Sequence, residues 1–310
     1  MKQLTLSDGT PVTPFAFGTM QFGGTADAAA SQALYDACRA AGITHFDSAY
    51  AYTEGRSETL LGDCARAERD KVYIATKVNY AGGGSAANIR ASFDESRKRL
   101  GLDTVDLLYM HRWTDDVPLD ETFGALAELQ QQGLIRHIGV SNYAAWQVMK
   151  AQAVAAKLGT RIDVIQPMYN LVKRQAEVEL LPMCAAEGIV AATYSPLGGG
   201  LLTGKYADGA DGRLKDSAMY AARYAPAAMH DAAAELSAIA AELGTHPATL
   251  AVAWVARHPA GPNPILSARS VEQLQPSLAG MTLAMDDGLY ARLSALTPTP
   301  PPATDRLEEA

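Results

Sequence analysis

The sequence predicts a single (β/α)8 barrel, and three observations lead to that prediction. Short apolar segments alternate with longer amphipathic ones along the chain, which is the pattern of parallel βα units. Eight such apolar segments can be counted, a number that fits a closed barrel better than an open sheet. The chain has 310 residues, 48% of them hydrophobic, which is enough to build one barrel with a full core.

The elements are predicted in the following order. The first dozen residues alternate around Asp8-Gly9 and indicate a β-hairpin. The strand candidates that follow it are 15–19, 44–49, 72–78, 105–111, 135–141, 163–168, 189–195 and 263–268. The helical stretches between them include 26–41, 86–100, 119–132 and 144–158.

One connection is too long for an ordinary turn. From Gly198 to about Met229 the chain carries Gly, Asp, Tyr and Arg without clear periodicity, so we expect a long loop after the seventh strand. Loops of that length are usually functional, and this one lies on the face where barrel active sites form. A surface insertion without function is the alternative. We expect residues 1–297 to form one domain and residues 298–310, rich in proline and charge, to form a polar tail.

Composition excludes several classes of protein. The net charge of −8 argues against a nucleic-acid partner. The N-terminus is too polar for a signal peptide and no apolar run reaches 18 residues, so we expect a cytoplasmic protein without a membrane partner. The three cysteines lie far apart and the six histidines lack metal-ligand spacing, which indicates reduced thiols and no metal site. No sequence feature indicates an obligate protein partner.

Four ionisable residues stand at or near the ends of three consecutive predicted strands. Asp47 ends the second strand, Lys77 the third and His111 the fourth, while Tyr52 lies five residues after Asp47. The carboxyl ends of the strands surround the active site of a barrel. Because burying an unpaired charge is costly, we expect Asp47 and Lys77 to pair.

These four residues together suit hydride addition to a carbonyl group. A tyrosine keeps its proton at neutral pH and can donate it, and a nearby ammonium is expected to lower its pKa towards the working range. The histidine can hydrogen-bond the same carbonyl oxygen. Taken singly, Lys77 could serve a structural ion pair and His111 could be a core histidine, but the set of four favours chemistry.

The motifs around these residues resemble those of the aldo-keto reductase family. FDSAYAYTEGRSE surrounds Asp47 and Tyr52, IATKV contains Lys77, and DLLYMHRW contains His111. GVSNY, IQPMYN and TYSPLGGGLLTGKY follow in family order, so the resemblance covers essentially the whole chain. It implies that Tyr52 is the general acid, that Lys77 and Asp47 tune it, and that His111 orients the carbonyl. The long loop resembles the branch related to potassium-channel β-subunits.

The resemblance also implies NADPH (NADP+) as the cofactor. It assigns the carboxamide to Ser141, Asn142 and Gln166, the stacking on the nicotinamide ring to Tyr194, and the pyrophosphate to the glycine-rich loop. The full set of implied cofactor positions is Thr19, Met20, Asp47, Ser141, Asn142, Gln166, Tyr194, Ser195, Pro196, Leu197, Gly199, Lys205, Ser267, Arg269 and Gln273.

The segment after the eighth strand is expected to read the adenosine phosphate. Arg269 precedes a predicted helix start at Val271, where an anion is favoured, and a guanidinium can hold the 2′-phosphate. Pairing of Arg269 with Glu272 or with solvent is the alternative. The chain departs from the family in two places: Ser267 stands where glycine is common, and Pro276-Ser277 replaces an acidic-Asn pair.

The substrate is expected to be a small carbonyl compound. The expected pocket residues are Met20, Phe22, Tyr52, Tyr80, His111 and Trp113. The aromatic ones suit an apolar or aromatic carbonyl, whereas Arg112 could equally serve a sugar or an acid.

Parts of the sequence also bear on three other functions, namely a regulatory subunit, a Rossmann dehydrogenase and a Schiff-base lyase. A nucleotide-sensing regulatory subunit would keep the same four residues, so the sequence leaves it open. A Rossmann dehydrogenase is suggested only by Gly82-Gly83-Gly84, which we expect to be a loop, and by the Tyr169/Lys173 spacing, which does not fall on a predicted helix. A Schiff-base lyase would need an uncharged Lys77, which a paired Asp47 disfavours.

Overall fold

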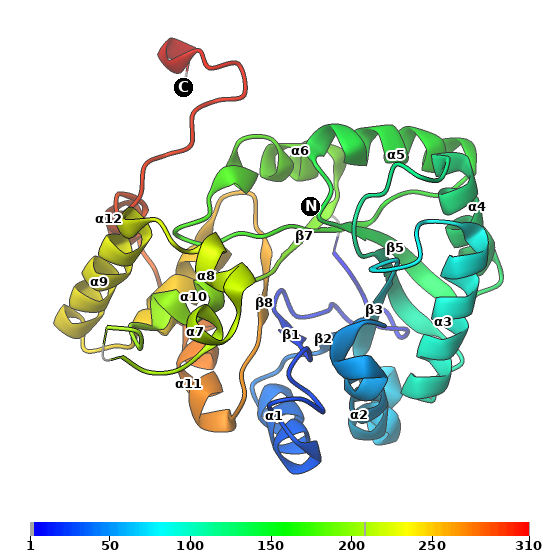
Figure 1. Cartoon of the computed structure of the whole chain (residues 1–310), viewed down its shortest axis with the longest axis horizontal. Coiled ribbons are helices and arrows are strands. Elements are labelled where there is room, and N and C mark those ends of the chain that lie inside the picture. Colours follow the sequence, from blue (N-terminus) through cyan, green and yellow to red (C-terminus); the bar gives the residue numbers. More distant parts are fainter. Residues whose placement is uncertain (1–2, 208, 310) are drawn as a thin grey trace.

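The computed structural model describes residues 3–207 and 209–309, within which eight parallel strands form a closed barrel (Figure 1). Neighbours in the ring are neighbours in the chain, and β8 pairs with β1 to close it. The strands are β1 (Ala16–Gly18), β2 (His45–Asp47), β3 (Tyr73–Val78), β4 (Val105–Met110), β5 (Ile135–Ser141), β6 (Val164–Gln166), β7 (Val190–Thr193) and β8 (Asn263–Leu266). Each strand falls inside a predicted segment, and the predicted (β/α)8 barrel is confirmed.

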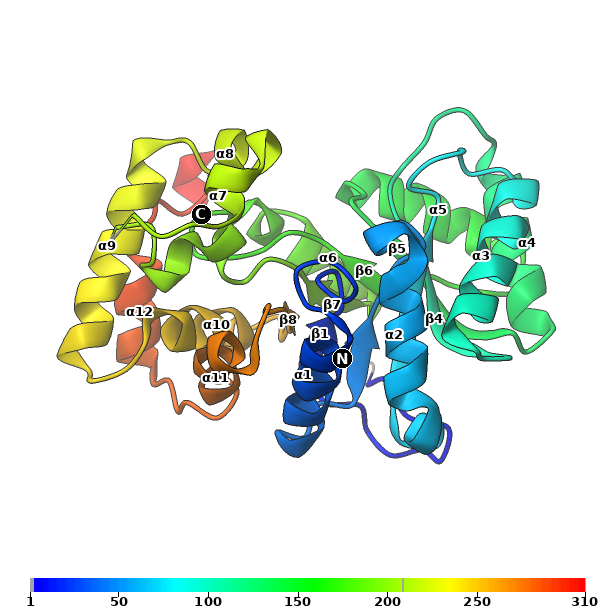
Figure 2. The same ribbon diagram turned by 60° about the horizontal axis from the view of Figure 1, so that its bottom comes forward.

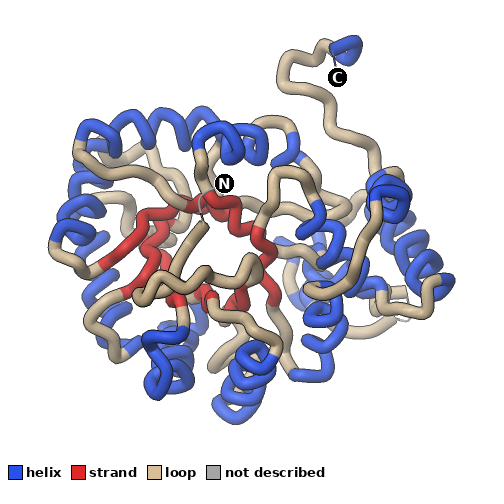
Figure 3. The backbone as a smooth tube through the Cα atoms, turned by 180° about the vertical axis from the view of Figure 1, so that it is seen from behind, coloured by secondary structure: helices blue, strands red, loops and turns tan. Residues whose placement is uncertain are grey.

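Helices surround the ring of strands, as Figure 3 shows. The longer ones are α1 (Ala28–Ala40), α2 (Arg56–Ala65), α3 (Ala86–Leu100), α4 (Leu119–Gln131), α5 (Ala145–Lys157), α6 (Leu180–Glu187), α9 (Ala227–Glu242), α10 (Pro247–Arg257), α11 (Val271–Gly280) and α12 (Asp287–Ser294). Capping side chains set several starts: Asp27 accepts from the Ala30 N–H at 2.8 Å, and Ser85 begins α3 directly after the glycine loop. None of the described helices is long and apolar enough to cross a membrane.

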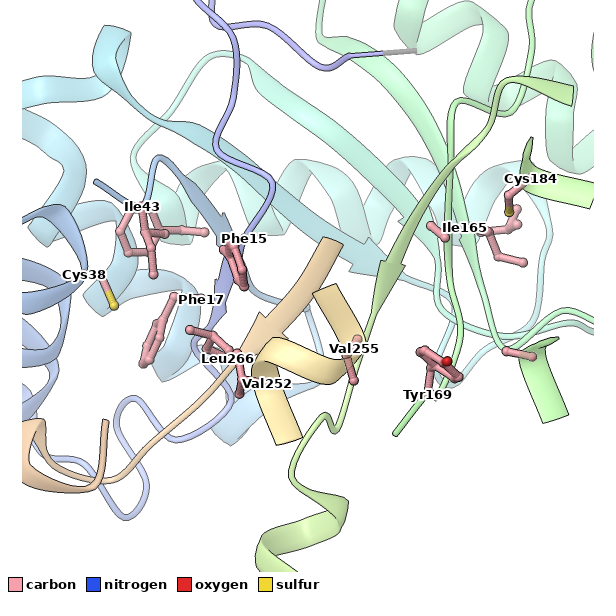
Figure 4. Packing of buried hydrophobic residues seen from close by; sticks show 14 of the residues in the cluster. Phe15, Phe17, Cys38, Ile43, Ile165, Tyr169, Cys184, Val252, Val255 and Leu266 are labelled. Carbon is pink, nitrogen blue, oxygen red and sulfur yellow. The ribbon is translucent and has the colours of Figure 1, made fainter. Parts of the chain in front are cut away.

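The hydrophobic core has an inner and an outer part because strand side chains alternate between two faces. Tyr73 and Tyr109 belong to the cluster inside the barrel, whereas Ile74 packs in the outer cluster against the helices. Figure 4 shows part of the outer cluster, where Phe17 and Val252 lie between the strands and their covering helices. This packing holds the strand ends that carry the polar residues.

The predicted N-terminal hairpin is present and covers the barrel where the strands begin. Thr5 and Pro11 form an antiparallel bridge, and the Val12 N–H donates to the Leu4 carbonyl at 2.8 Å. Gly9 makes the turn with a φ of 87°, in the region that favours glycine. Leu4 and Val12 join the inner core cluster. The hairpin therefore closes the end of the barrel opposite the polar rim.

The connection after β7 is more ordered than the sequence predicted. In place of an aperiodic loop, the chain forms η4 (Gly198–Thr203), α7 (Arg213–Asp216) and α8 (Ala218–Arg223) before α9 begins. Figure 2 shows α7 and α8 gathered beside α9. Helices of four to six residues make little more than one turn, so they leave no periodic apolar stripe to detect.

The segment after α12 extends away from the barrel, as the red trace in Figure 1 shows. Up to residue 309 it contains only one short helical turn, η5 (Leu307–Glu309). Residues 1–2 of the predicted domain, residue 208 of the long connection and residue 310 of the predicted tail lie outside the described residues.

Candidate active site

Four polar side chains that the sequence singled out meet at the rim formed by β2, β3 and β4. Asp47 is the last residue of β2, Lys77 is the last but one of β3, and His111 directly follows β4. Tyr52 begins the short helix η1 (Tyr52–Gly55) after β2. The Lys77 Nζ atom lies 3.3 Å from the Tyr52 hydroxyl, and the rings of Tyr52 and His111 are 5.9 Å apart between centroids. The structure thus brings all four together.

Lys77 and Asp47 form a buried ion pair beside Tyr52. The Lys77 ammonium donates to Asp47 Oδ2 at 2.5 Å, to the Ser48 carbonyl at 2.8 Å and to the Tyr52 hydroxyl at 3.3 Å, so each of its protons has an acceptor. The lysine side chain has no exposed surface. Burial by itself lowers the pKa of Lys77, but the charge of Asp47 and its hydrogen bond outweigh burial and raise that pKa. The expected pair forms, and Lys77 is a cation at neutral pH.

The pKa of Tyr52 is shifted in the direction opposite to the one expected from the sequence. Lys77 does lower it, but burial raises it by more and Asp47 raises it further, so the pKa lies above 10. The sequence indicated an ammonium near the phenol without indicating how much water the ring would lose. Tyr52 is therefore a neutral phenol at physiological pH. The neighbouring ammonium favours the phenolate that remains once the proton is donated.

His111 presents a neutral imidazole next to Tyr52. Burial, together with the charges of Lys77 and Arg112, lowers the pKa of His111 to about 3. Its Nδ1 atom is buried and has no hydrogen-bond partner among the described residues. A neutral imidazole carries a single N–H that can donate to a carbonyl oxygen without adding charge to the site. No group of three or more His, Cys, Asp or Glu suited to a metal ion occurs in the described part of the chain.

An unusual stretch of backbone holds Tyr52 in place. Thr53 and Glu54 have φ angles of 46° and 58°, in the left-handed region that residues other than glycine rarely adopt. The Thr53 hydroxyl donates to the Phe22 carbonyl at 2.8 Å and accepts from the Ser57 N–H at 2.9 Å. Sequence reasoning missed Thr53, because its role depends on a contact 31 residues away; a hydroxyl residue just before a helix is the only local sign.

The four residues expected around the nicotinamide form one hydrogen-bonded chain across β5, β6 and β7; they are Ser141, Asn142, Gln166 and Tyr194. The Gln166 amide donates to Asp47 Oδ1 at 3.0 Å, and the Ser141 hydroxyl donates to the Gln166 carbonyl at 2.9 Å. Asn142 donates to the His111 carbonyl at 3.0 Å and accepts from the Tyr194 hydroxyl at 2.8 Å. The chain links these side chains directly to the Asp47–Lys77 pair and to His111.

The turn after β7 supplies a glycine-rich surface and a cation; its expected cofactor positions are Ser195, Pro196, Leu197, Gly199 and Lys205. Gly199 has a φ of 67°, and a Cβ atom there would lie 2.9 Å from the Tyr220 ring of α8, so only glycine fits. Lys205 Nζ donates to the uncharged Asp211 carbonyl at 2.9 Å. Burial and the nearby Arg269 and Arg213 lower the pKa of Lys205, which indicates an excess of positive charge. The sequence did not indicate Tyr220, because α8 has no periodic pattern.

The start of α11 adds polar groups to the same region. Arg269 Nη2 lies 3.7 Å from Asp216 Oδ2 of α7, so its partner is neither Glu272 nor solvent alone. The Ser267 hydroxyl oxygen is buried without a hydrogen-bond partner among the described residues. Gln273 Oε1 accepts from the Arg269 N–H at 3.4 Å. An unsatisfied hydroxyl, a helix start and several cations within one region fit the phosphates of a dinucleotide.

Pro276 and Ser277, where the sequence departs from the family, both lie within α11. Ser277 is only 1% exposed, so its side chain is turned inward and is not available to an adenine ring at the surface. The Thr249 hydroxyl of α10 donates to the Pro276 carbonyl at 2.7 Å. The Pro276 carbonyl, on the face of α11 that packs against α10, therefore already has a hydrogen-bond donor.

Two expected site residues, Phe22 of the substrate pocket and Thr19 of the cofactor site, belong to the core instead. Phe22 has no exposed surface and its ring packs against Phe17 at a centroid distance of 5.9 Å, so it does not line a substrate pocket. Thr19 is also fully buried, and its hydroxyl is bonded to Ser57 Oγ at 2.8 Å. The chain turns sharply after β1, where the Phe22 N–H donates to the Thr19 carbonyl at 2.9 Å. The sequence indicated the strand end but not this turn.

Of the remaining expected pocket residues, the structure places Tyr80 beside His111, while Met20 and Trp113 are partly exposed. Tyr80 is 51% exposed and its ring lies 4.9 Å from that of His111. Met20 is half-buried. Trp113 is also half-buried and meets the ring of Trp146 edge-on at 5.7 Å. Trp146, which the sequence did not indicate, is the second residue of α5 and is 60% exposed.

Comparison with known proteins matches residues 14–297 to the aldo/keto reductase family. A probable voltage-gated potassium channel subunit beta of Oryza sativa subsp. japonica is 34% identical over 290 residues, which cover 88% of each chain. Aflatoxin B1 aldehyde reductase member 2 of Rattus norvegicus is 38% identical over 211 residues, covering 64% of this chain and 56% of that protein. The uncharacterized oxidoreductase YrpG of Bacillus subtilis (strain 168) is 33% identical over 316 residues, covering 94% of each chain.

Proposed function

The chain belongs to the aldo/keto reductase family, and on that basis we propose that it reduces aldehydes or ketones to alcohols with NADPH, with Tyr52 as the general acid. The family and the relatives named as reductases share the oxidoreduction of carbonyl compounds. The observation that carries the finer proposal is the position of the Lys77 ammonium, 2.5 Å from Asp47 and 3.3 Å from the Tyr52 hydroxyl.

The four rim residues divide the work of protonating the carbonyl oxygen. NADPH, when bound, would supply the hydride that reduces the carbonyl carbon. Tyr52 donates its phenolic proton to the oxygen, and Lys77 stabilises the phenolate that results. The neutral His111 donates one N–H to the same oxygen and sets its direction. Asp47 holds Lys77 in its charged form, which also disfavours a Schiff-base role for that lysine.

In this proposal, the cofactor would be held by groups at the ends of β5 and β6, in the turn after β7 and at the start of α11. Ser141, Asn142 and Gln166 would hold the carboxamide, and Tyr194 would lie against the nicotinamide ring. Ser195, Pro196, Leu197, Gly199 and Lys205 surround the pyrophosphate; Ser267, Arg269 and Gln273 lie at the adenosine phosphate. Burial and, after it, the charges of Arg269 and Arg213 lower the pKa of Lys205 against the opposing Asp216 and Asp211; a phosphate bound beside these cations would favour the charged lysine, which supports this assignment.

The test is turnover with a carbonyl panel. The purified chain is mixed with NADPH and aromatic aldehydes, short ketones, methylglyoxal or sugars, and the loss of NADPH absorbance and the alcohol product are both measured. We expect alcohol formed in equal amount to the NADPH consumed with at least one class. NADPH binding without turnover of any carbonyl would contradict the proposal and favour a regulatory role.

A further inference from the structure

Arg112 lies at the mouth of the site, one residue after His111. Its guanidinium lies over the Tyr80 ring, 5.2 Å from the centroid, and that ring lies 4.9 Å from the ring of His111. The three side chains therefore lie in a row from the imidazole outward to the cation, with the Tyr80 ring tilted by 56° to that of His111. The Asn79 amide donates to the Arg112 carbonyl at 3.1 Å, which fixes the backbone beneath this row.

Arg112 is a cation without a carboxylate of its own. Among the described residues no acidic side chain lies within ion-pairing distance of its guanidinium, whose recorded contact is the Tyr80 ring. Asp115, three residues on, accepts from the Trp113 indole N–H at 2.6 Å. Asp116 faces Gly83 in the neighbouring loop. The acidic residues closest in sequence are thus turned towards other groups.

We propose that Arg112 binds a carboxylate at the far end of the carbonyl substrate, so that this enzyme prefers aldehydes or ketones that carry an acid group. The proposal rests on the carbonyl reduction proposed above. The contact with the Tyr80 ring uses none of the guanidinium N–H groups in an ion pair, so paired N–H groups remain for a two-point contact with a carboxylate. Tyr80, which lies between Arg112 and His111, provides an apolar wall for the body of such a substrate.

The charge of Arg112 has a separate and smaller effect on His111. It helps to lower the pKa of the imidazole, but burial is the largest cause and Lys77 comes next. Replacing Arg112 therefore leaves His111 neutral in the physiological range, and a neutral substrate should be reduced as before. This separation makes a matched pair of substrates informative.

The test compares para-carboxybenzaldehyde with its methyl ester, which has nearly the same shape but no charge. We expect the acid-to-ester ratio of kcat/KM to fall about tenfold in Arg112→Met, the low end for a hydrogen bond to a charged group because the side chain is exposed. Arg112→Lys should recover part of the ratio. Arg66→Met, at the far end of α2, is the matched control and should change nothing.

Several results would overturn the proposal. An unchanged ratio in Arg112→Met would do so, as would equal losses for acid and ester or a ratio that falls only in Arg223→Met, an arginine of α8. If the wild type reduces neither compound, carbonyl reduction of this class fails, and binding of para-(hydroxymethyl)benzoate followed by tryptophan fluorescence decides instead. There we expect about tenfold weaker binding in Arg112→Met, and equal binding would refute the carboxylate site.

Discussion

The site has two regions that are held together in different ways. At the ends of β2, β3 and β4 the charges are buried: Lys77 has no exposed surface and all three of its ammonium protons have acceptors. At the connection after β7 and the start of α11 the charges are exposed, with Arg269 33% and Asp216 56% exposed and their nearest atoms 3.7 Å apart. In the first region the charged groups are shielded from solvent, whereas in the second they are exposed and can change partners.

The buried and the exposed ion pair suit different tasks, proton donation in the first region and cofactor binding in the second. A buried ion pair is costly to break from one side, so it keeps one geometry through a reaction. An exposed pair contributes little, about 0–1 kcal/mol, and can be exchanged for another partner at small cost. A group that aims a proton benefits from the first arrangement. A group that releases and rebinds a phosphate benefits from the second.

The largest effect is expected from Tyr52→Phe, which alters the buried region alone. Carbonyl reduction should fall about 10²–10⁴-fold, the usual contribution of a general acid, because the variant has no proton to donate. The affinity for NADPH should hardly change, since the hydroxyl contacts Lys77 and the substrate side. Steady-state rates and a fluorescence titration measure the two quantities. Retention of more than about a tenth of kcat would rule out Tyr52 as the acid.

Lys77→Met tests the contrast between the buried and the exposed ion pair, and the quantity compared is the free energy of unfolding. Removing one partner leaves the Asp47 carboxylate buried without its cation, so the free energy of unfolding should fall by roughly 3–5 kcal/mol. Asp216→Asn, which removes one partner of the exposed pair, should cost less than about 1 kcal/mol. Urea unfolding measures both.

The double variant Asp47→Asn with Lys77→Met is the control for this comparison. It should be more stable than Lys77→Met alone, because no unpaired charge is left inside. If the two single losses simply add, the residues are not coupled and the contrast between the regions is lost.

The buried region should also make the stability of the protein depend on pH, through His111. The pKa of His111 is lowered to about 3, below its unfolded value of roughly 6.5, so the unfolded chain binds a proton that the folded chain does not. The contribution to stability is full above pH 6.5 and is lost as the pH falls towards 3. At pH 5 the loss is about 2 kcal/mol.

His111→Asn should therefore lose less stability than the wild type between pH 7 and pH 5, as measured by urea unfolding at both values. The curve will not become flat, because burial also lowers the pKa of His45 to about 4. Equal acid losses in variant and wild type would show that His111 does not remain neutral in the folded chain.

Among the expected changes in function, the smallest is that of Arg269→Ala in the open region. NADPH binding should weaken about tenfold, the low end for a hydrogen bond to a charged group, because Arg269 is partly exposed and has Asp216 as a competing partner. NADH lacks the 2′-phosphate and should bind as before. Titration of both cofactors by intrinsic fluorescence compares them. Equal losses for the two would mean that Arg269 does not read this phosphate.

Features that repeat over a few residues could be predicted from the sequence. The apolar segments marked all eight strands, and Asp47, Lys77 and His111 could be placed at one rim because parallel strands of a barrel end on the same side. The helical stretches 26–41 and 86–100 could be predicted as well, and the structure adds the caps that begin them, Asp27 and Ser85, which accept from N–H groups three residues away.

Features that depend on distant segments were decided only by the tertiary structure. Phe22 follows a strand end like a pocket residue, but the turn after β1 buries it against Phe17. The pKa of Tyr52 rises because burial outweighs Lys77, and Arg269 meets Asp216, 53 residues earlier in the chain. Local order arises from backbone geometry and short-range hydrogen bonds, which a sequence window contains. Burial and charge balance are sums over every neighbour in space, and those neighbours exist only once the chain has folded.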